Sequence, residues 1–170
     1  MAKRNEVRWH GRGGQGAKTA SYILASAAAE DGWNVQAFPE YGAERRGAPM
    51  KSYVRISDEP IRPRCAVLHP QVVVVLDSTL LGSENVTDGV PDGGIVIVNT
   101  SDSPEEVRAR LANQNIQVCT VNATQISLDT VGRDIPNTPM LGALAKVSDL
   151  VSVEGAKAAV RKQLGTKLSE

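Results

Sequence analysis

Three glycines near the start of the chain form the first pattern that could do chemistry. Gly11, Gly13 and Gly16 satisfy the spacing GxGxxG, in which glycines let backbone N–H groups approach an anion at the start of a following helix. A dinucleotide site of this type also needs an acidic residue at the end of the second strand, where this chain has Gln36-Ala-Phe38. The pattern leaves three alternatives: a nucleotide site, a tight turn that requires glycine, and a site for another anion or a partner chain.

Two loops that contain arginine favour an anion or a partner chain. Arg12 lies inside the glycine loop, together with the amide side chain of Gln15. A second loop contains Glu44, Arg45 and Arg46. Adjacent arginines are either a solvated turn or a means of gripping a carboxylate, a phosphate or a neighbouring chain. If the strands that precede the two loops are parallel, both loops lie at one edge of the sheet, where open α/β proteins bind ligands.

Two further polar segments are candidates to join these loops. Asp77 and Ser78 come directly after an apolar strand, so we expect them at the same sheet edge. Asn137 and Thr138 lie in a segment bounded by prolines. That segment could approach the loops, or it could be a simple turn with an N-capping threonine.

Other groups with catalytic potential are few. The chain has two cysteines, Cys65 and Cys119, far apart in the sequence, which excludes a resident iron–sulfur cluster and a disulfide framework. Two histidines, His10 and His69, are too few for a His-rich metal site. Cys65 has arginine neighbours, but we expect a buried structural thiol. His10 is either an acid–base group or a packed, hydrogen-bonded histidine.

The composition narrows the class of protein further. Lysine plus arginine number 19 and aspartate plus glutamate number 19, which gives a formal net charge of zero in 170 residues. A general nucleic-acid or anionic-membrane binder needs an excess of positive charge, so neither class is expected. The N-terminal residues lack the apolar segment of a signal peptide, and no apolar run is long enough to span a membrane. We therefore expect a cytoplasmic domain.

The periodicity of apolar residues predicts an α/β fold. The first forty residues read as strand, glycine loop, alanine-rich helix and strand, a Rossmann-like βαβ unit. Residues 51–57 alternate as a strand, and we expect residues 61–64 to pair with them in an antiparallel hairpin. Ser103, Pro104 and Glu106 are typical of a helix start. We expect strands at residues 6–10, 33–38, 51–57, 72–76, 95–98 and 116–121, and helices at 17–31, 79–85, 103–113, 141–148 and 153–163. The predicted fold is one three-layer α/β/α domain over residues 1–170, with a mixed, mostly parallel sheet.

Three longer motifs resemble a known family. They are Trp9-His-Gly-Arg-Gly-Gly-Gln-Gly-Ala-Lys18, Gln36-Ala-Phe-Pro-Glu-Tyr-Gly-Ala-Glu-Arg-Arg-Gly-Ala-Pro-Met50 and Ile135-Pro-Asn-Thr-Pro-Met-Leu-Gly-Ala-Leu144. In residue type and in order along the chain, the three motifs are similar to those of the gamma subunits of 2-oxoacid:ferredoxin oxidoreductases, most closely the pyruvate synthase type. The resemblance covers nearly the whole chain. Members of the family usually continue beyond the position of Glu170 into a further helix.

The resemblance implies a function that the residues alone do not show. Enzymes of this family oxidatively decarboxylate a 2-oxoacid to an acyl-CoA and pass the electrons to ferredoxin. Thiamine diphosphate with Mg²⁺ is shared between alpha and beta subunits, and 4Fe–4S clusters lie on beta and on a ferredoxin-like delta subunit. The gamma subunit is implied to bind no cofactor alone, to pack on the catalytic subunits and to help form the region that contacts coenzyme A. Pyruvate and branched-chain 2-oxoacids stay open as substrates.

The resemblance also gives the candidate residues a location. Arg12, Gly13, Gly14, Gln15 and Gly16 are expected to face coenzyme A or the shared active site. Interface or anion contacts are expected from Glu44, Arg45, Arg46, Asn137 and Thr138. Two alternatives stay open: a stand-alone domain that binds NAD or FAD, and a purely structural subunit whose loops only dock.

Overall fold

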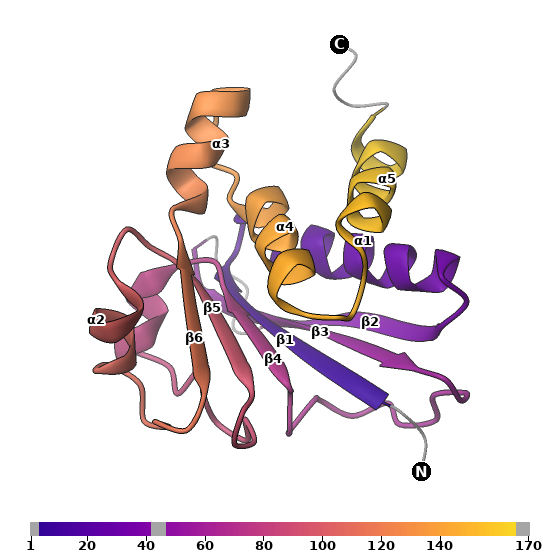
Figure 1. The fold of residues 1–170 in the computed structure, drawn as a ribbon, viewed down its shortest axis with the longest axis horizontal. Helices are drawn as coiled ribbons and strands as arrows, with labels where there is room; N and C mark the ends of the chain where they lie inside the picture. Colours follow the sequence, from indigo (N-terminus) through magenta and orange to yellow (C-terminus); the bar gives the residue numbers. More distant parts are fainter. Residues whose placement is uncertain (1–3, 42–46, 166–170) are drawn as a thin grey trace.

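The chain folds around one six-stranded sheet with the order β2-β3-β1-β4-β5-β6 (Figure 1). The structure is a computed structural model that describes residues 4–41 and 47–165. Strands β1, β4, β5 and β6 are mutually parallel, whereas β3 is antiparallel to both of its neighbours, β1 and β2. The strands are β1 (Arg4–Arg12), β2 (Asn34–Tyr41), β3 (Pro49–Ser57), β4 (Val72–Val75), β5 (Ile95–Asn99) and β6 (Gln117–Val121). This confirms a mixed, mostly parallel sheet in an α/β domain.

The position of β3 corrects two predictions about the first half of the chain. Strands β1 and β2 are parallel, as a βαβ unit requires, but β3 lies between them. The predicted hairpin with residues 61–64 is wrong, because that segment forms no strand and β3 pairs with β1 and β2 instead. Pro60 and Pro63 explain the difference, since proline has no N–H to donate to a ladder.

Helices cover the two faces of the sheet unequally. The helices α1 (Ala17–Glu30), α4 (Asn137–Val147) and α5 (Val153–Leu164) lie on one face (Figure 1). Alanines of α1 approach the sheet closely and bury Trp9, Val54 and Ile56 in the larger core. The other face has a smaller core under the 3₁₀ helix η1 (Ser78–Gly82) and α2 (Pro104–Arg108), built on β4, β5 and β6. Runs of valine and isoleucine in β4 and β5 face both cores, as expected for strands buried on both sides.

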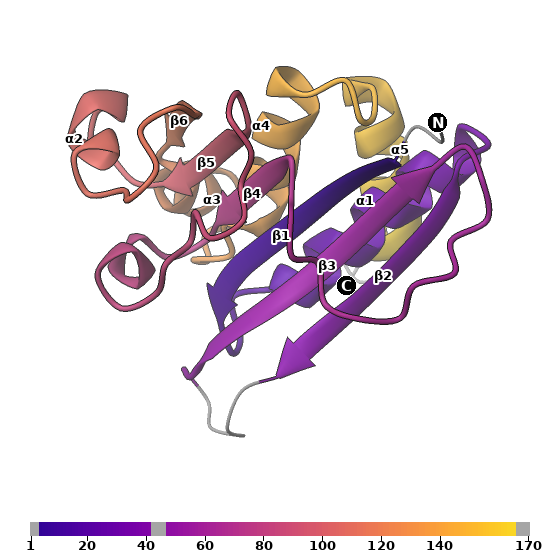
Figure 2. The same cartoon turned by 90° about the horizontal axis from the view of Figure 1, so that it is seen from below.

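The rest of the second face, over β1 and β3, carries polar side chains. Figure 2 views this face, with α1 behind the strands. The guanidinium of Arg55 is buried there and donates to Glu6 Oε1 at 2.7 Å and Gln36 Oε1 at 2.8 Å. It also donates to the backbone carbonyls of Cys65 at 2.8 Å and Ala66 at 3.1 Å. One buried arginine therefore ties three elements together and holds the segment after β3 against the sheet.

Several helix boundaries differ from those predicted. Helix α2 begins as predicted, with Ser103 at the N-cap and Pro104 at the first position, and Ser103 and Glu106 form a capping box; the helix ends at Arg108 and not near Asn113. Helix α4 begins at Asn137, one turn before the predicted start. Helix α3 (Ala123–Val131) was not predicted, although Asn122 caps its start and Gly132, in the left-handed region, ends it. Its apolar side chains Ile126, Leu128 and Val131 are exposed, so its sequence lacks the one-sided stripe of a core-facing helix. Within the described residues no helix is both long and apolar enough to cross a membrane.

Candidate functional site

The candidate site lies where β1 and β4 end, at the same edge of the sheet. The N–H of Leu76 donates to the carbonyl of His10 at 2.8 Å, which fixes the two strand ends side by side. The glycine loop follows β1 and Asp77 follows β4. The carboxyl edge of the parallel strands thus brings the two segments together as the sequence predicted.

Asp77 is the centre of a hydrogen-bonded network at this edge. Its Oδ2 accepts from Arg12 Nε at 3.2 Å and from Gln15 Nε2 at 2.8 Å. Its Oδ1 accepts from the backbone N–H and the hydroxyl of Thr79, at 3.0 and 2.6 Å. Burial by itself would raise the pKa of Asp77, but the hydrogen bonds from Thr79 and Gln15, together with the Arg12 charge, hold the pKa below its usual value. The carboxylate is therefore a structural anion that orders the glycine loop.

Most N–H groups of the Arg12 guanidinium donate to other groups of the chain. Besides Asp77, it donates from Nη1 to the carbonyl of Gly47 at 3.2 Å and from Nη2 to Thr79 Oγ1 at 2.9 Å. A guanidinium has five N–H groups, so one on each terminal nitrogen stays available within the described structure. The loop backbone is further fixed by Gln15, whose Oε1 accepts from the N–H of Arg12 at 2.8 Å.

Asn137 lies directly against the glycine loop. Gly16 adopts a φ of 84°, and a Cβ added to it would lie 2.4 Å from Asn137 Nδ2. Only glycine fits both the backbone conformation and the space. Gly16 is also the N-cap of α1 and supplies no side chain to cap that helix, so the loop presents the first-turn N–H groups of α1 to whatever lies outside.

Thr138 follows Asn137 in the first turn of α4. Its backbone N–H donates to Asn137 Oδ1 at 2.8 Å. The structure therefore brings Asn137 to Gly16, with Thr138 next to it in the chain. The other predicted contacts, Glu44, Arg45 and Arg46, lie outside the described residues. Gly47, which is described, lies beside the glycine loop, since its carbonyl accepts from Arg12 Nη1 at 3.2 Å.

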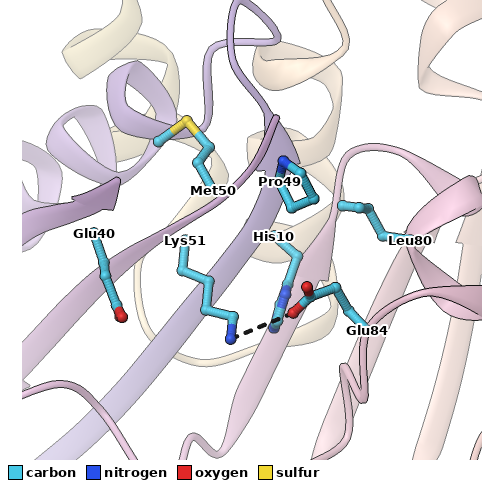
Figure 3. A pocket seen from close by; sticks show the side chains of 7 residues that line it. All are labelled: His10, Glu40, Pro49, Met50, Lys51, Leu80 and Glu84. Carbon is cyan, nitrogen blue, oxygen red and sulfur yellow. Dashed lines mark ion pairs between the residues drawn. The ribbon is translucent and has the colours of Figure 1, made fainter. Parts of the chain in front are cut away.

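A pocket adjoins the loop on the face of the sheet opposite α1. It has a volume of about 160 Å³ and is lined by His10, Glu40, Pro49, Met50, Lys51, Leu80 and Glu84 (Figure 3). Lys51 Nζ lies 3.4 Å from Glu84 Oε2, and Glu40 accepts a short hydrogen bond from the Tyr53 hydroxyl. His10 is the one lining residue that was predicted as a candidate. The other six residues come from three separate segments of the chain, so no local pattern in the sequence points to them.

His10 is not suited to acid–base catalysis in this structure. Arg8 Nε donates to His10 Nε2 at 3.0 Å, and the ring is 2% exposed. Burial, with the nearby charges of Arg8 and Lys51, lowers the pKa of His10 to about 3. Of the two alternatives that the sequence left open, the packed and hydrogen-bonded histidine is the one observed.

Comparison with known proteins shows the family of this chain. Residues 6–170 match the family described as pyruvate ferredoxin/flavodoxin oxidoreductase. The chain belongs to this family. It is 52% identical over 165 residues to the pyruvate synthase subunit PorC of Thermotoga maritima, an alignment that spans 97% of this chain and 85% of that protein. It is 50% identical to the pyruvate/ketoisovalerate oxidoreductases common subunit gamma of Thermococcus kodakarensis, over 97% and 89% of the two chains.

Solved structures share the fold of this chain. The crystal structure of the Thermotoga maritima PORC subunit matches with a TM-score of 0.86 at 50% identity, over 95% of this chain and 85% of that chain. A 2-oxoglutarate:ferredoxin oxidoreductase from Magnetococcus marinus has the same fold within 28% of its own chain, with a TM-score of 0.78 at 20% identity. The chain thus belongs to the gamma (PorC) group of the family.

The two cysteines of this gamma-group chain lie in different environments. Cys65 is exposed, which corrects the prediction of a buried thiol: Arg55 Nη2 holds the segment through the Cys65 carbonyl at 2.8 Å and contacts its Sγ at 3.9 Å, but the residue stays accessible to solvent. Cys119 is half-buried, and burial raises the pKa of its thiol. Across residues 4–41 and 47–165 no three His, Cys, Asp or Glu side chains gather to hold a metal ion.

Proposed function

We propose that this chain is the gamma subunit of a multi-subunit 2-oxoacid:ferredoxin oxidoreductase that converts pyruvate to acetyl-CoA with ferredoxin as electron acceptor. The observation that carries the proposal is the similarity to PorC and gamma subunits over 97% of the chain. In this proposal the chain is cytoplasmic and packs on alpha, beta and delta subunits. Those subunits hold the thiamine diphosphate, the Mg²⁺ and the 4Fe–4S clusters. For the clusters the cysteine count supports this, since a cluster needs about four cysteine ligands and this chain has two cysteines.

The glycine loop is the part of the chain that we propose to face coenzyme A or the shared active site. Three features support this role: the uncapped start of α1 at Gly16, the two remaining N–H groups of Arg12, and the hydrogen bonds that hold both in place before any ligand arrives. Phosphate groups bind at such helix starts because N–H groups and the helix dipole point at them. The Magnetococcus marinus enzyme that shares the fold is described with coenzyme A bound.

The proposal leaves the choice of 2-oxoacid to the catalytic subunits. One relative is named as a subunit common to pyruvate and ketoisovalerate oxidoreductases. A subunit shared between two such enzymes does not need to distinguish their 2-oxoacids. We therefore expect this chain to contribute binding and closure rather than substrate selection.

Purification of the chain with and without its partners tests the assignment. We expect affinity-tagged chain to bring down alpha, beta and delta subunits in a complex with iron–sulfur absorbance and 2-oxoacid oxidation activity. The isolated chain should show no such activity. Oxidation of a 2-oxoacid by the isolated chain, or tight binding of NAD or FAD to it, would overturn the proposal.

The Arg12→Ala variant tests the role of the glycine loop in the assembled enzyme. A raised KM for coenzyme A with normal assembly supports a ligand contact, whereas failed assembly supports a docking role. An unchanged enzyme rejects both roles for Arg12. Arg161→Ala is the matched control, because Arg161 is an exposed arginine in the last turn of α5.

A further inference from the structure

The pocket beside the glycine loop is lined by His10, whose second ring nitrogen carries a proton with no acceptor among the described residues. An arginine N–H can only donate, so the bond from Arg8 Nε to His10 Nε2 requires a lone pair on Nε2. The single proton of the neutral ring is therefore on Nδ1. No acceptor among the described residues receives that N–H, although the side chain is 98% buried.

His10 is one of the residues that line the pocket of Figure 3, together with Lys51 and Glu84. A donor held this way costs free energy when it is left without an acceptor, so an oxygen placed against it is stabilised.

Positive charge reinforces this donor from two sides. Arg8 is buried, and its guanidinium donates to His10 and to the backbone carbonyls of Val86 at 3.1 Å and Asp88 at 2.6 Å. A cation bonded to Nε2 polarises the ring and strengthens the Nδ1–H donor. Lys51 projects into the same pocket from β3, the partner strand of β1, where it is paired in register with His10.

The carboxylates in the pocket are already engaged. Glu84 lies 3.4 Å from Lys51 Nζ, and Glu40 accepts from the Tyr53 hydroxyl. An ammonium has three N–H donors, so Lys51 can bind a second oxygen while it stays next to Glu84. Pro49 and Leu80 supply a small apolar surface, whereas the Met50 side chain points away from the pocket toward the core under α1 (Figure 3). The groups available to a ligand are therefore the Nδ1–H of His10, the ammonium of Lys51 and a short apolar surface.

We infer that this pocket binds a small monocarboxylate, with one oxygen on His10 Nδ1–H and the other on Lys51 Nζ. The volume of about 160 Å³ suits a ligand of a few heavy atoms. The apolar end of the ligand packs against Pro49 and Leu80. This site is separate from the glycine loop, and it does not depend on the proposed function of the chain.

Titration of the ¹⁵N-labelled full chain with sodium acetate, at constant ionic strength kept by sodium chloride, tests the inference. We expect saturable shifts at the His10 ring nitrogens and at the backbone amides of Lys51 and Glu84. Acetamide has nearly the same shape without the charge, and we expect it to bind at least about tenfold more weakly, since charge-assisted hydrogen bonds are roughly twice as strong as neutral ones.

Two variants separate binding in the pocket from a general effect of acetate. Lys51→Met keeps most of the side-chain length and should raise the acetate Kd about tenfold or more. Lys157→Met, at an exposed lysine on α5, should leave the Kd unchanged. His10→Gln keeps an acceptor for Arg8 and removes the Nδ1–H, so it should lose acetate binding; if it does not fold, the Lys51 and acetamide comparisons decide. Shifts that sodium chloride reproduces without saturation, equal binding of acetamide, or an unaffected Lys51→Met variant would each overturn the inference.

Discussion

Acid should destabilise this protein through His10 in a way that one substitution can isolate. In the folded chain the pKa of His10 is lowered to about 3 by burial and by the charges of Arg8 and Lys51, whereas an unperturbed histidine has a pKa of 6.5. Between these two values the unfolded chain binds a proton that the folded chain does not. The free energy of unfolding therefore rises with pH across this window. The contribution of His10 is fully present above about pH 6.5 and is lost as the pH falls toward 3.

The size of the effect follows from the same two pKa values. Each pH unit inside the window changes the free energy of unfolding by about 1.4 kcal/mol. Going from about pH 7 to about pH 4.5 should then cost about 2.5 kcal/mol through His10 alone. Urea denaturation at a series of pH values measures the slope. Carboxylates with lowered pKa values, such as Asp77, lose stability in the same direction, so the wild-type slope by itself is not decisive.

The His10→Gln variant isolates the contribution of the histidine. Its side-chain oxygen can still accept from Arg8, but it cannot titrate. We expect the variant to be less stable than wild type near pH 7 and to lose about 1.4 kcal/mol less per pH unit between about pH 6 and about pH 4. His69→Gln, at an exposed histidine, is the control and should keep the wild-type slope. Equal slopes in wild type and His10→Gln would refute the assignment of a buried, neutral His10.

Three further substitutions test the loop network and a helix cap, each by chemical denaturation. Gly16→Ala should cost more than about 2 kcal/mol, since a Cβ there meets Asn137 and the backbone is left-handed; an alanine of wild-type stability would show that the loop is not held as described. Asp77→Asn should cost about 1–2 kcal/mol and loosen Arg12, because it removes a charged acceptor; unchanged amide exchange in the glycine loop would contradict this. Ser103→Ala should cost about 1 kcal/mol by removing the cap of α2, and no change would mean that water replaces the cap.

Local patterns in the sequence were sufficient to predict much of the fold. The glycine loop between strand and helix, the valine run of β4 and the capping box at Ser103 each depend on neighbours within a few residues, and each is present. The convergence of the glycine loop with Asp77 was also predictable, because parallel strands end at a common edge. The family motifs then gave the assignment that no single residue type could give.

The features that were missed depend on contacts between distant segments. Nothing within residues 49–57 shows that β3 separates β1 from β2, since strand order is set by how whole elements pack. Helix α3 was missed because its apolar residues face outward. The environment of His10 depends on Arg8 through a ring nitrogen and on Lys51 through strand register, and neither contact leaves a signature in the spacing. The exposure of Cys65 likewise depends on a distant contact, because Arg55 of β3 holds the segment that contains Cys65 against the sheet.

The position of β3 between β1 and β2 also constrains the order in which the chain can fold. If β1 and β2 paired first, they would have to separate again before β3 could enter between them. We expect β2 and β3, joined by a short connection, to form a hairpin early, and β1 to add to its free edge afterwards. Alanine substitutions at the β2–β3 contact should then slow folding, whereas those at the β1–β3 contact should mainly speed unfolding. The β1–α1–β2 unit is contiguous in the sequence, but because β3 lies between its two strands it would be completed last.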